Sequence, residues 1–215
     1  MCTELIKEHK QRSSEIKAKL EGYRQRGLHA TDEEIFEVMC HCICSPKTDY
    51  TGVPIAIQEL KRSNLLLSGS TEEIARYLKK HKVRFPTRKA GYMVEARAEF
   101  LGDNAQTRLR HILDLLRGIE PLEARKRLRE LLRGLGLGMK ETSEFLRNLG
   151  LGSNYAILDS RILKHLKKCG IIQEIPKPLT RKAYLEVEDK MTKWSQKIGI
   201  PLDELDILLF HWQTQ

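Results

Sequence analysis

A glycine-punctuated hairpin between two helical patterns constrains the fold of this chain more than any other feature. A leucine-rich segment runs into residues 134–138, GLGLG, and a new helical pattern begins directly after them at Met139. Glycine permits a positive φ and a close approach of backbones, while Leu135 and Leu137 can anchor the turn in a core. The pattern therefore predicts a tight helix-hairpin-helix.

The second helix of such a hairpin begins with unpaired amide N–H groups. The helix dipole favours an anion there, and a DNA phosphate is one such anion. Gly136 and Gly138 are therefore candidate DNA-binding residues. The alternative is a plain αα-corner with a glycine C-cap, and it would be preferred if the glycines stood alone.

A lysine stands beside the glycines. Lys140 lies in the first turn of the second helix, where the macrodipole opposes a positive charge and should lower the pKa of the amine. A neutral amine can act as a nucleophile. The alternative is a solvated surface lysine, which most of the 38 Lys and Arg residues must be.

One carboxylate follows the apolar run at residues 156–158. Asp159 precedes another amphipathic pattern, so its simplest role is an N-cap that accepts from the amides of the next turn. A catalytic role is compatible with capping, because a cap is held rigidly and a catalytic carboxylate must be rigid.

Three segments carry a resemblance to a known family. Residues 136–143 (GLGMKETS), 145–148 (FLRN) and 157–159 (ILD) resemble the helix-hairpin-helix (HhH-GPD) DNA glycosylase superfamily, with its glycine- and proline-rich loop and its aspartate. Within it, the chain is most similar to the compact archaeal-type 8-oxoguanine DNA glycosylase/AP lyases. Residues 84–90 and 172–177 extend the likeness over most of the chain.

The resemblance implies a base-excision-repair enzyme that acts on damaged double-stranded DNA and needs no cofactor. By resemblance, Lys140 is the amine that attacks C1′ of the damaged nucleotide, and Asp159 is the carboxylate that assists it. An imine would follow, and β-elimination would cut the strand. The resemblance also implies an all-α, two-domain fold with the active site in the interdomain cleft. The expected domains are residues 30–147, and residues 1–29 together with 148–215.

The charge of the chain agrees with a polyanionic partner. Lys and Arg number 38 against 29 Asp and Glu, which gives a net charge of +9. Such a charge supports sequence-independent affinity for DNA, although charge alone does not separate DNA from RNA or an anionic membrane. No apolar run approaches the roughly 20 residues of a membrane span, and no apolar signal opens the chain. We therefore expect a cytoplasmic monomer that does not bind a membrane.

The cysteines do not form a recognisable metal motif. Cys40, Cys42 and Cys44 lie in an apolar segment, which favours buried reduced thiols. A metal site would need a fourth ligand, for which His41 or His29 is available, but the usual CxxC pairs are missing. The closely spaced C-terminal cysteines of iron–sulfur relatives such as endonuclease III are also missing, so we expect no metal and no iron–sulfur cluster.

Helical periodicity covers the chain, and no segment alternates as a strand would. Gly27 should end the first helix, and capping boxes at Thr31 and Ser70 should each begin one. The expected helices span residues 3–26, 32–44, 54–66, 86–101, 105–116, 121–132, 160–168, 180–198 and 201–212, in addition to those begun by Ser70 and Met139.

Base recognition is where the chain departs from its relatives. They place an asparagine near Lys47 that fills the gap left by the flipped base, and a tryptophan near Phe210 that stacks on the lesion. Lys47 could reach the orphaned base or a phosphate, or could be a surface lysine in a loop. Phe210 or Trp212 could supply the stacking face, or could pack in the core against Leu205 and Leu209.

Three functions remain open on these grounds. The first is a bifunctional glycosylase/lyase for an oxidised purine, 8-oxoguanine above all. The second is a glycosylase of altered lesion specificity, and the third is a catalytically silent helix-hairpin-helix DNA-binding module. The presence of Lys140 together with Asp159 favours an enzyme over the silent module.

Overall fold

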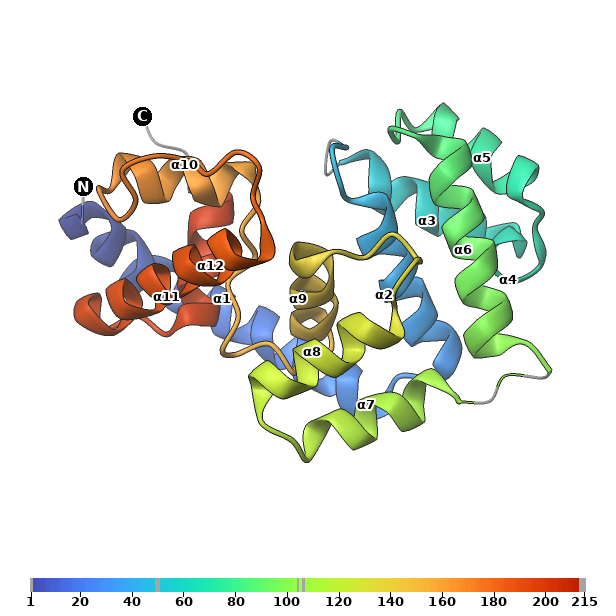
Figure 1. The fold of residues 1–215 in the computed structure, drawn as a ribbon, viewed down its shortest axis with the longest axis horizontal. Helices are drawn as coiled ribbons and strands as arrows, with labels where there is room; N and C mark the ends of the chain where they lie inside the picture. The colour runs from blue at the N-terminus through green and yellow to red at the C-terminus, as the bar shows by residue number, and fades with distance from the viewer. Residues whose placement is uncertain (1, 49–50, 104, 106, 213–215) are drawn as a thin grey trace. The chain divides into compact units, whose positions relative to one another are not determined.

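Figure 1 shows the computed structural model of the chain, which describes residues 2–48, 51–103, 105 and 107–212. The helices are α1 (Cys2–His29), α2 (Asp32–Cys44), α3 (Gly52–Arg62), α4 (Leu65–Ser68), α5 (Thr71–Lys80), α6 (Pro86–Leu101), α7 (Leu109–Arg117), α8 (Pro121–Leu131), α9 (Met139–Asn148), α10 (Ser160–Lys168), α11 (Arg181–Ile198) and α12 (Leu202–His211). Turns and loops join them, and the described residues contain no strand. The prediction of an all-α fold is confirmed.

The chain forms two compact units. One comprises Gly27–Phe145, and the other combines the residues up to Arg26 with those from Leu146 onward. The predicted domains, residues 30–147 and residues 1–29 with 148–215, remain a prediction, because a domain is defined by independent folding as well as by its contacts.

The unit Gly27–Phe145 is built around α2, which packs against α3, α6 and α7, while α5 packs along α6. The predicted capping boxes begin α2 and α5: the Thr31 and Ser70 side chains accept from backbone amides, and the Thr31 and Ser70 amides donate to the Glu34 and Glu73 carboxylates. These caps explain why the two helix starts could be read from sequence.

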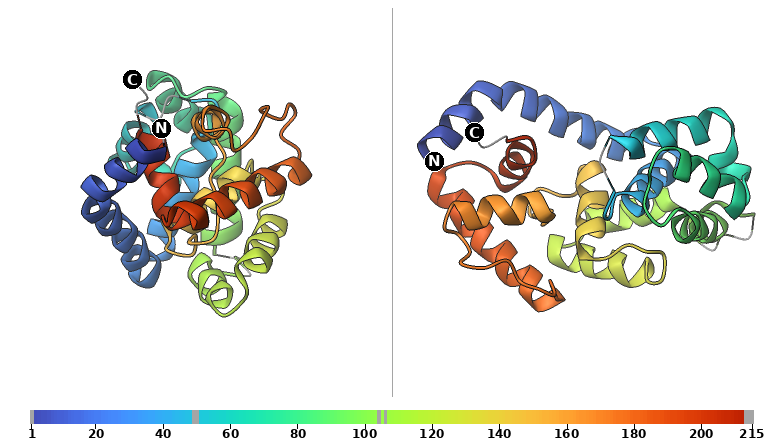
Figure 2. Two further views of the ribbon diagram at one scale, coloured as in Figure 1. Left: turned by 90° about the vertical axis from the view of Figure 1, so that its left-hand side faces the viewer. Right: turned by 90° about the horizontal axis from the view of Figure 1, so that it is seen from above.

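The prediction that Gly27 ends the first helix is wrong. Figure 2 shows α1 as one unbroken helix, and it continues through Gly27 to His29. The Gly27 carbonyl accepts hydrogen bonds from the guanidinium groups of Arg110 and Arg117. Glycine costs a helix interior roughly 1 kcal/mol relative to alanine, and these two bonds at its own carbonyl are a local compensation.

Two other helices differ from their predicted bounds. The helix expected over residues 54–66 is split into α3 and α4, because Asn64 adopts a left-handed conformation with φ of 59°. The helix expected over residues 105–116 begins only at Leu109, where the distant Asp32 carboxylate accepts from the Arg110 amide. Residue 106 of that prediction lies outside the described part.

In the second unit, α12 packs against both α10 and α11. It is almost wholly buried, and its buried residues include Asp203, Glu204 and Asp206. Residues 151–159 form an irregular segment that leads into α10. None of the helices among the described residues has the length and apolar character that crossing a membrane would require.

Candidate active site and DNA interface

The hairpin between α8 and α9 has the geometry that its glycines predict. Gly134 and Gly136 have positive φ values of 94° and 76°, and Leu135 and Leu137 are buried. A Cβ on Gly136 would lie 2.4 Å from the Tyr92 ring, so no other residue fits there without rearrangement. The predicted helix-hairpin-helix turn is confirmed.

A pocket of about 550 Å³ opens at this hairpin. Its lining combines backbone of the turn with basic side chains and comprises Tyr92, Arg129, Glu130, Arg133, Gly134, Gly136, Leu137 and Gly138. The prediction of unpaired amides is wrong at Gly138, whose N–H donates to the Glu141 carboxylate at 3.0 Å. Glu141 stands in the first turn of α9 and caps its own helix, so an anion could contact that amide only after Glu141 had moved.

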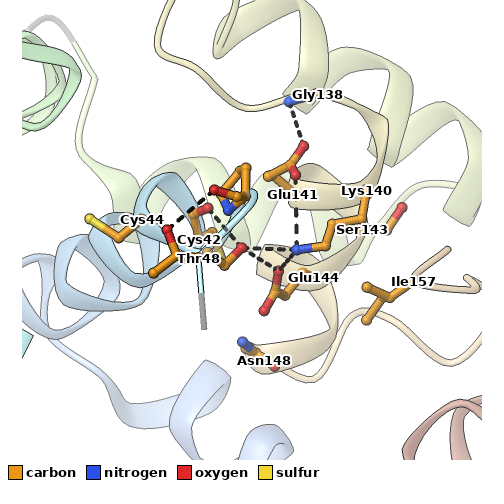
Figure 3. Close-up of polar contacts among 12 residues, drawn as sticks. Cys42, Cys44, Thr48, Gly138, Lys140, Glu141, Ser143, Glu144, Asn148 and Ile157 are labelled. Carbon is orange, nitrogen blue, oxygen red and sulfur yellow. Dashed lines mark hydrogen bonds and ion pairs between the residues drawn. The ribbon is translucent and has the colours of Figure 1, made fainter. Parts of the chain in front are cut away.

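The Lys140 amine is held by a small polar network (Figure 3). Its Nζ donates to Glu144 Oε2 at 2.7 Å and to Ser45 Oγ at 2.8 Å, and Glu141 Oε1 lies 3.9 Å away. The Lys140 side chain is only 20% exposed. The alternative of a solvated surface lysine is therefore wrong.

The charge on Lys140 is stabilised, contrary to the sequence prediction. Burial lowers the pKa of the amine, but the carboxylates of Glu144 and Glu141 outweigh burial and raise that pKa above the ordinary lysine value. The helix dipole is a weaker influence than a carboxylate one helical turn away. Lys140 therefore rests as an ammonium group, and a proton must leave before it can act as a nucleophile.

The loop after α2 brings Ser45 to the amine, and a buried lysine fixes this loop. Lys89 Nζ donates to the carbonyl oxygens of Cys44 and Pro46 at 2.7 and 2.8 Å, and to Thr48 Oγ1 at 2.9 Å. Burial lowers the pKa of Lys89 to about 8. Sequence reasoning assigned no role to Lys89 or Ser45, since nothing local in sequence links them to Lys140.

Asp159 is the N-cap of α10, as predicted. Its Oδ1 accepts from the amides of Arg161 and Ile162 at 2.8 and 2.9 Å. The cap holds this carboxylate in place, and the catalytic role of Asp159 stays a prediction.

The segment before Asp159 is held by buried side chains that take the place of a neighbouring strand. The amide of Ala156 donates to Glu188 at 3.0 Å, that of Ile157 to Asp206 at 2.8 Å, and that of Leu158 to the Tyr184 hydroxyl at 3.3 Å. The Tyr184 hydroxyl in turn donates to the Ala156 carbonyl at 2.6 Å. Asp206 also pairs with Arg147 at 2.6 Å, and burial raises the pKa of its carboxyl to about 6 despite that partner.

The candidate base-recognition residues are at least partly exposed. Lys47 is exposed in the loop after α2, with a left-handed φ of 56°. The Phe210 ring lies 4.9 Å from the Arg161 guanidinium, and the Trp212 ring centroid is 5.3 Å from that of His165. Neither aromatic belongs to the fully buried core, and both their role in stacking and their packing against Leu205 and Leu209 stay predictions.

The three clustered cysteines are buried, reduced thiols, as predicted. Burial raises the pKa of Cys44 to about 12 and that of Cys40 well above the usual range, so both stay protonated. Among the described residues, no group of three or more His, Cys, Asp or Glu side chains is arranged to hold a metal ion.

Comparison with known proteins decides the family. A family model described as 8-oxoguanine DNA glycosylase matches residues 16–200. The chain belongs to this family. The predicted family and enzyme class, the bifunctional DNA glycosylase/AP lyases, are thereby confirmed, and the helix-hairpin-helix fold class with them.

Two relatives and two solved structures illustrate the family. An 8-oxoguanine DNA glycosylase/AP lyase of Fusobacterium nucleatum is 36% identical over 97% of this chain and 93% of its own length. One of Methanocaldococcus jannaschii is 34% identical over 86% and 82%. The Thermotoga maritima glycosylase structure has a TM-score of 0.82 and 28% identity, covering 98% of this chain and 94% of the other. The M. jannaschii enzyme bound to a 15mer DNA containing 8-oxoguanine has a TM-score of 0.80 and 28% identity, covering 96% and 95%.

Proposed function

We propose that this family member excises 8-oxoguanine from duplex DNA through Lys140 and then cuts the strand by β-elimination. The observation that carries the proposal is the Lys140 amine, which is held by a carboxylate and a hydroxyl away from bulk solvent. The names of the relatives support the substrate and both activities. An ordered amine suits a nucleophile better than it suits a silent DNA-binding module.

The reaction begins with extrusion of the damaged nucleotide, because C1′ within a duplex is out of reach of protein side chains. The neutral Lys140 amine then bonds to C1′ while the glycosidic bond breaks and its electron pair leaves with the base. We assign to Asp159 the stabilisation of the positive charge that develops on the sugar. The nitrogen then loses a proton, and its electron pair forms the C1′=N bond of an imine while the C1′–O4′ bond of the sugar ring breaks and O4′ takes up a proton. The imine acidifies the C2′ protons, and removal of one of them expels the 3′ phosphate.

DNA binding is assigned to the hairpin pocket and the net charge of +9. Arg129 and Arg133 line the pocket beside the backbone of Gly136, and guanidinium groups pair readily with phosphate. Affinity for undamaged duplex should fall linearly on a log–log plot against salt. A valine at Gly136 is a poor probe of this binding, because it would clash with Tyr92 whether or not DNA is bound.

Borohydride trapping tests the proposal. Sodium borohydride added to the protein with a duplex carrying 8-oxoguanine should give a covalent adduct, and Lys140→Gln should abolish it. Lys126→Gln, on the exposed face of α8, is the matched control and should leave the adduct intact. An adduct that persists undiminished in Lys140→Gln would remove Lys140 from the mechanism. Asp159→Asn keeps a capping oxygen and should still bind DNA while turnover falls steeply.

Lys47 stands where the family resemblance implies an asparagine, and this difference favours a second candidate, a glycosylase of altered specificity. A panel of duplexes with 8-oxoguanine opposite each base, together with uracil and alkylated adenine, distinguishes the two candidates. We expect 8-oxoguanine to be removed fastest, with shallow discrimination among opposite bases. Cleavage restricted to uracil or alkylated bases would favour the altered specificity. That the enzyme acts as a monomer also stays a prediction.

A further inference from the structure

The Lys140 ammonium must lose a proton before it attacks, and its surroundings limit which group can take that proton. Among the described residues of the unit Gly27–Phe145, the charged and titratable groups around it are Glu141 and Glu144 of α9, Cys42 of α2, and Lys89 of α6. Lys89 is itself a cation, and Cys42 is a buried thiol. Neither Lys89 nor Cys42 is therefore suited to receive the proton.

The two carboxylates differ in their geometry toward the amine. Glu141 lies 3.9 Å from Lys140 Nζ, and its other oxygen is engaged by the Gly138 amide. Glu144 accepts from Lys140 Nζ at 2.7 Å, and its side chain is 12% exposed. Of these two carboxylates, Glu144 is therefore the one within hydrogen-bond reach of the proton that must leave.

The Ser45 hydroxyl completes a three-membered arrangement. Its oxygen accepts from Lys140 Nζ at 2.8 Å, and the same hydroxyl is 3.1 Å from Glu144 Oε2. Ser45 lies on the loop that Lys89 fixes. The Lys140 amine and the Glu144 carboxylate, both on α9, therefore share a hydrogen-bond partner that lies outside α9. This arrangement resembles a nucleophile and base oriented by a third group.

We propose that Glu144 is a catalytic residue, the base that accepts a proton from the Lys140 ammonium, and that Ser45 is a positioning residue for both groups. The proposal rests on the proposed function of Lys140. In the step, one N–H bond of the ammonium breaks, its electron pair stays on Nζ, and the proton bonds to Glu144 Oε2. The departing base then takes up that proton as the C1′ bond forms.

The ion pair between Lys140 and Glu144 has an opposite explanation, in which Glu144 acts as a brake: it slows the reaction by stabilising the ammonium form of Lys140. A carboxylate that only raises the pKa of Lys140 would reduce the amount of neutral amine at neutral pH. Removing such a carboxylate would speed the reaction. Removing a base would slow it, so the sign of the effect separates the two explanations.

Single-turnover trapping on DNA with an abasic site measures the amine without the excision step. With Glu144→Gln, we expect the trapping rate constant at pH 7 to fall about 100-fold. The wild-type rate should be nearly flat between about pH 6 and 7.5, below the pKa of about 8 of Lys89, because proton transfer within the pair needs no change of net charge. The Glu144→Gln rate should rise about tenfold per pH unit, because the variant depends on amine that has lost its proton to solvent.

Two further variants test whether the effect is specific to the Glu144 carboxylate. Glu123→Gln removes a partly exposed carboxylate from α8 and should leave the rate unchanged. Ser45→Ala keeps the carboxylate and should slow trapping by less than Glu144→Gln does, with the flat pH profile retained. Equal melting temperatures and equal affinities for undamaged duplex check that each variant is folded.

A Glu144→Gln rate at pH 7 that equals or exceeds the wild-type rate would overturn the proposal and support the brake. A wild-type profile that itself rises tenfold per pH unit would do the same. If the wild-type protein forms no adduct on either DNA, the proposed function of Lys140 fails first, and that outcome is distinct from an adduct that is insensitive to Glu144.

Discussion

Two irregular segments carry candidate site residues, and they are fixed by side chains of opposite charge. The loop after α2, which carries Ser45 and Lys47, is held by the buried Lys89 ammonium through carbonyl and hydroxyl oxygens. The segment before Asp159 is held by Glu188 and Asp206 through backbone amides, together with the Tyr184 hydroxyl.

The backbone group that would otherwise be unpaired decides which charge is used. The Cys44 carbonyl is at the C-terminal end of α2, where helix carbonyls lack partners and the dipole favours a cation. The amides of residues 156–158 are buried in an irregular segment, and the described residues offer no strand to pair with it, so these amides require side-chain acceptors. A buried ion is costly in either setting, and here each one replaces secondary structure that the segment does not have.

Removal of the buried acid Asp206 should have the largest effect. Asp206→Leu leaves the Ile157 amide without its acceptor and Arg147 without its carboxylate, so the free energy of unfolding should fall by about 3–5 kcal/mol. Urea denaturation measures the change. Asp206→Asn keeps an oxygen for the Ile157 amide and should lose less, and the exposed Asp189→Asn should change little. A fully stable Asp206→Leu would show that the segment is held by packing alone.

The corresponding change in the other segment is Lys89→Met. It removes the donor shared by the carbonyls of Cys44 and Pro46, and the free energy of unfolding should fall by roughly 2–3 kcal/mol. Borohydride trapping should slow as well, because Ser45 is no longer fixed beside Lys140. Lys79→Met on the exposed face of α5 controls for the loss of one charge. If trapping kept its wild-type rate in Lys89→Met, the loop would not position the amine.

Local chemistry accounts for what the sequence could predict. Glycines at 134 and 136, the capping boxes at Thr31 and Ser70, and the Asp159 cap each act within a few residues, so their patterns specified the structure correctly. The Lys140 and Glu144 pair was visible as an i,i+4 spacing, yet its effect on the pKa outweighs the dipole argument made from Lys140 alone.

Long-range partners account for what the sequence could not predict. Asp206 meets Ile157, and Lys89 meets Cys44, only after separate helices have packed. Gly27 lies within α1, and its carbonyl accepts from Arg110 and Arg117, which no sequence pattern near Gly27 indicates. Polar residues inside helical patterns are read by default as exposed, and Asp206 and Lys89 are exceptions that tertiary structure creates.

The two buried ions should also give stability slopes of opposite sign. The folded-state pKa of Asp206 is raised from 3.8 to about 6, so the folded state holds the extra proton, and its contribution to stability falls as pH rises between those values. The folded-state pKa of Lys89 is lowered from 10.5 to about 8, so its contribution rises with pH between 8 and 10.5. The free energy of unfolding should be measured against pH for wild type, Asp206→Asn and Lys89→Met. The difference between wild type and each variant should have a slope of up to about 1.4 kcal/mol per pH unit. Parallel slopes in the two windows would contradict the comparison.

The smallest expected effect concerns Lys47, which the Lys89-fixed loop holds in a left-handed conformation. Asparagine adopts that conformation more readily than lysine, so Lys47→Asn should raise the free energy of unfolding by up to about 0.5 kcal/mol. If Lys47 contacts a DNA phosphate, the same change should reduce the slope of log affinity against log salt by about 0.9.

Lys82 provides the matched control, because it is an exposed lysine with a φ of 58° that is replaced in the same way. Lys82→Asn should share the gain in stability but leave the salt slope unchanged. An equal loss of slope in both variants would place Lys47 among the general surface cations and remove it from the candidate DNA contacts.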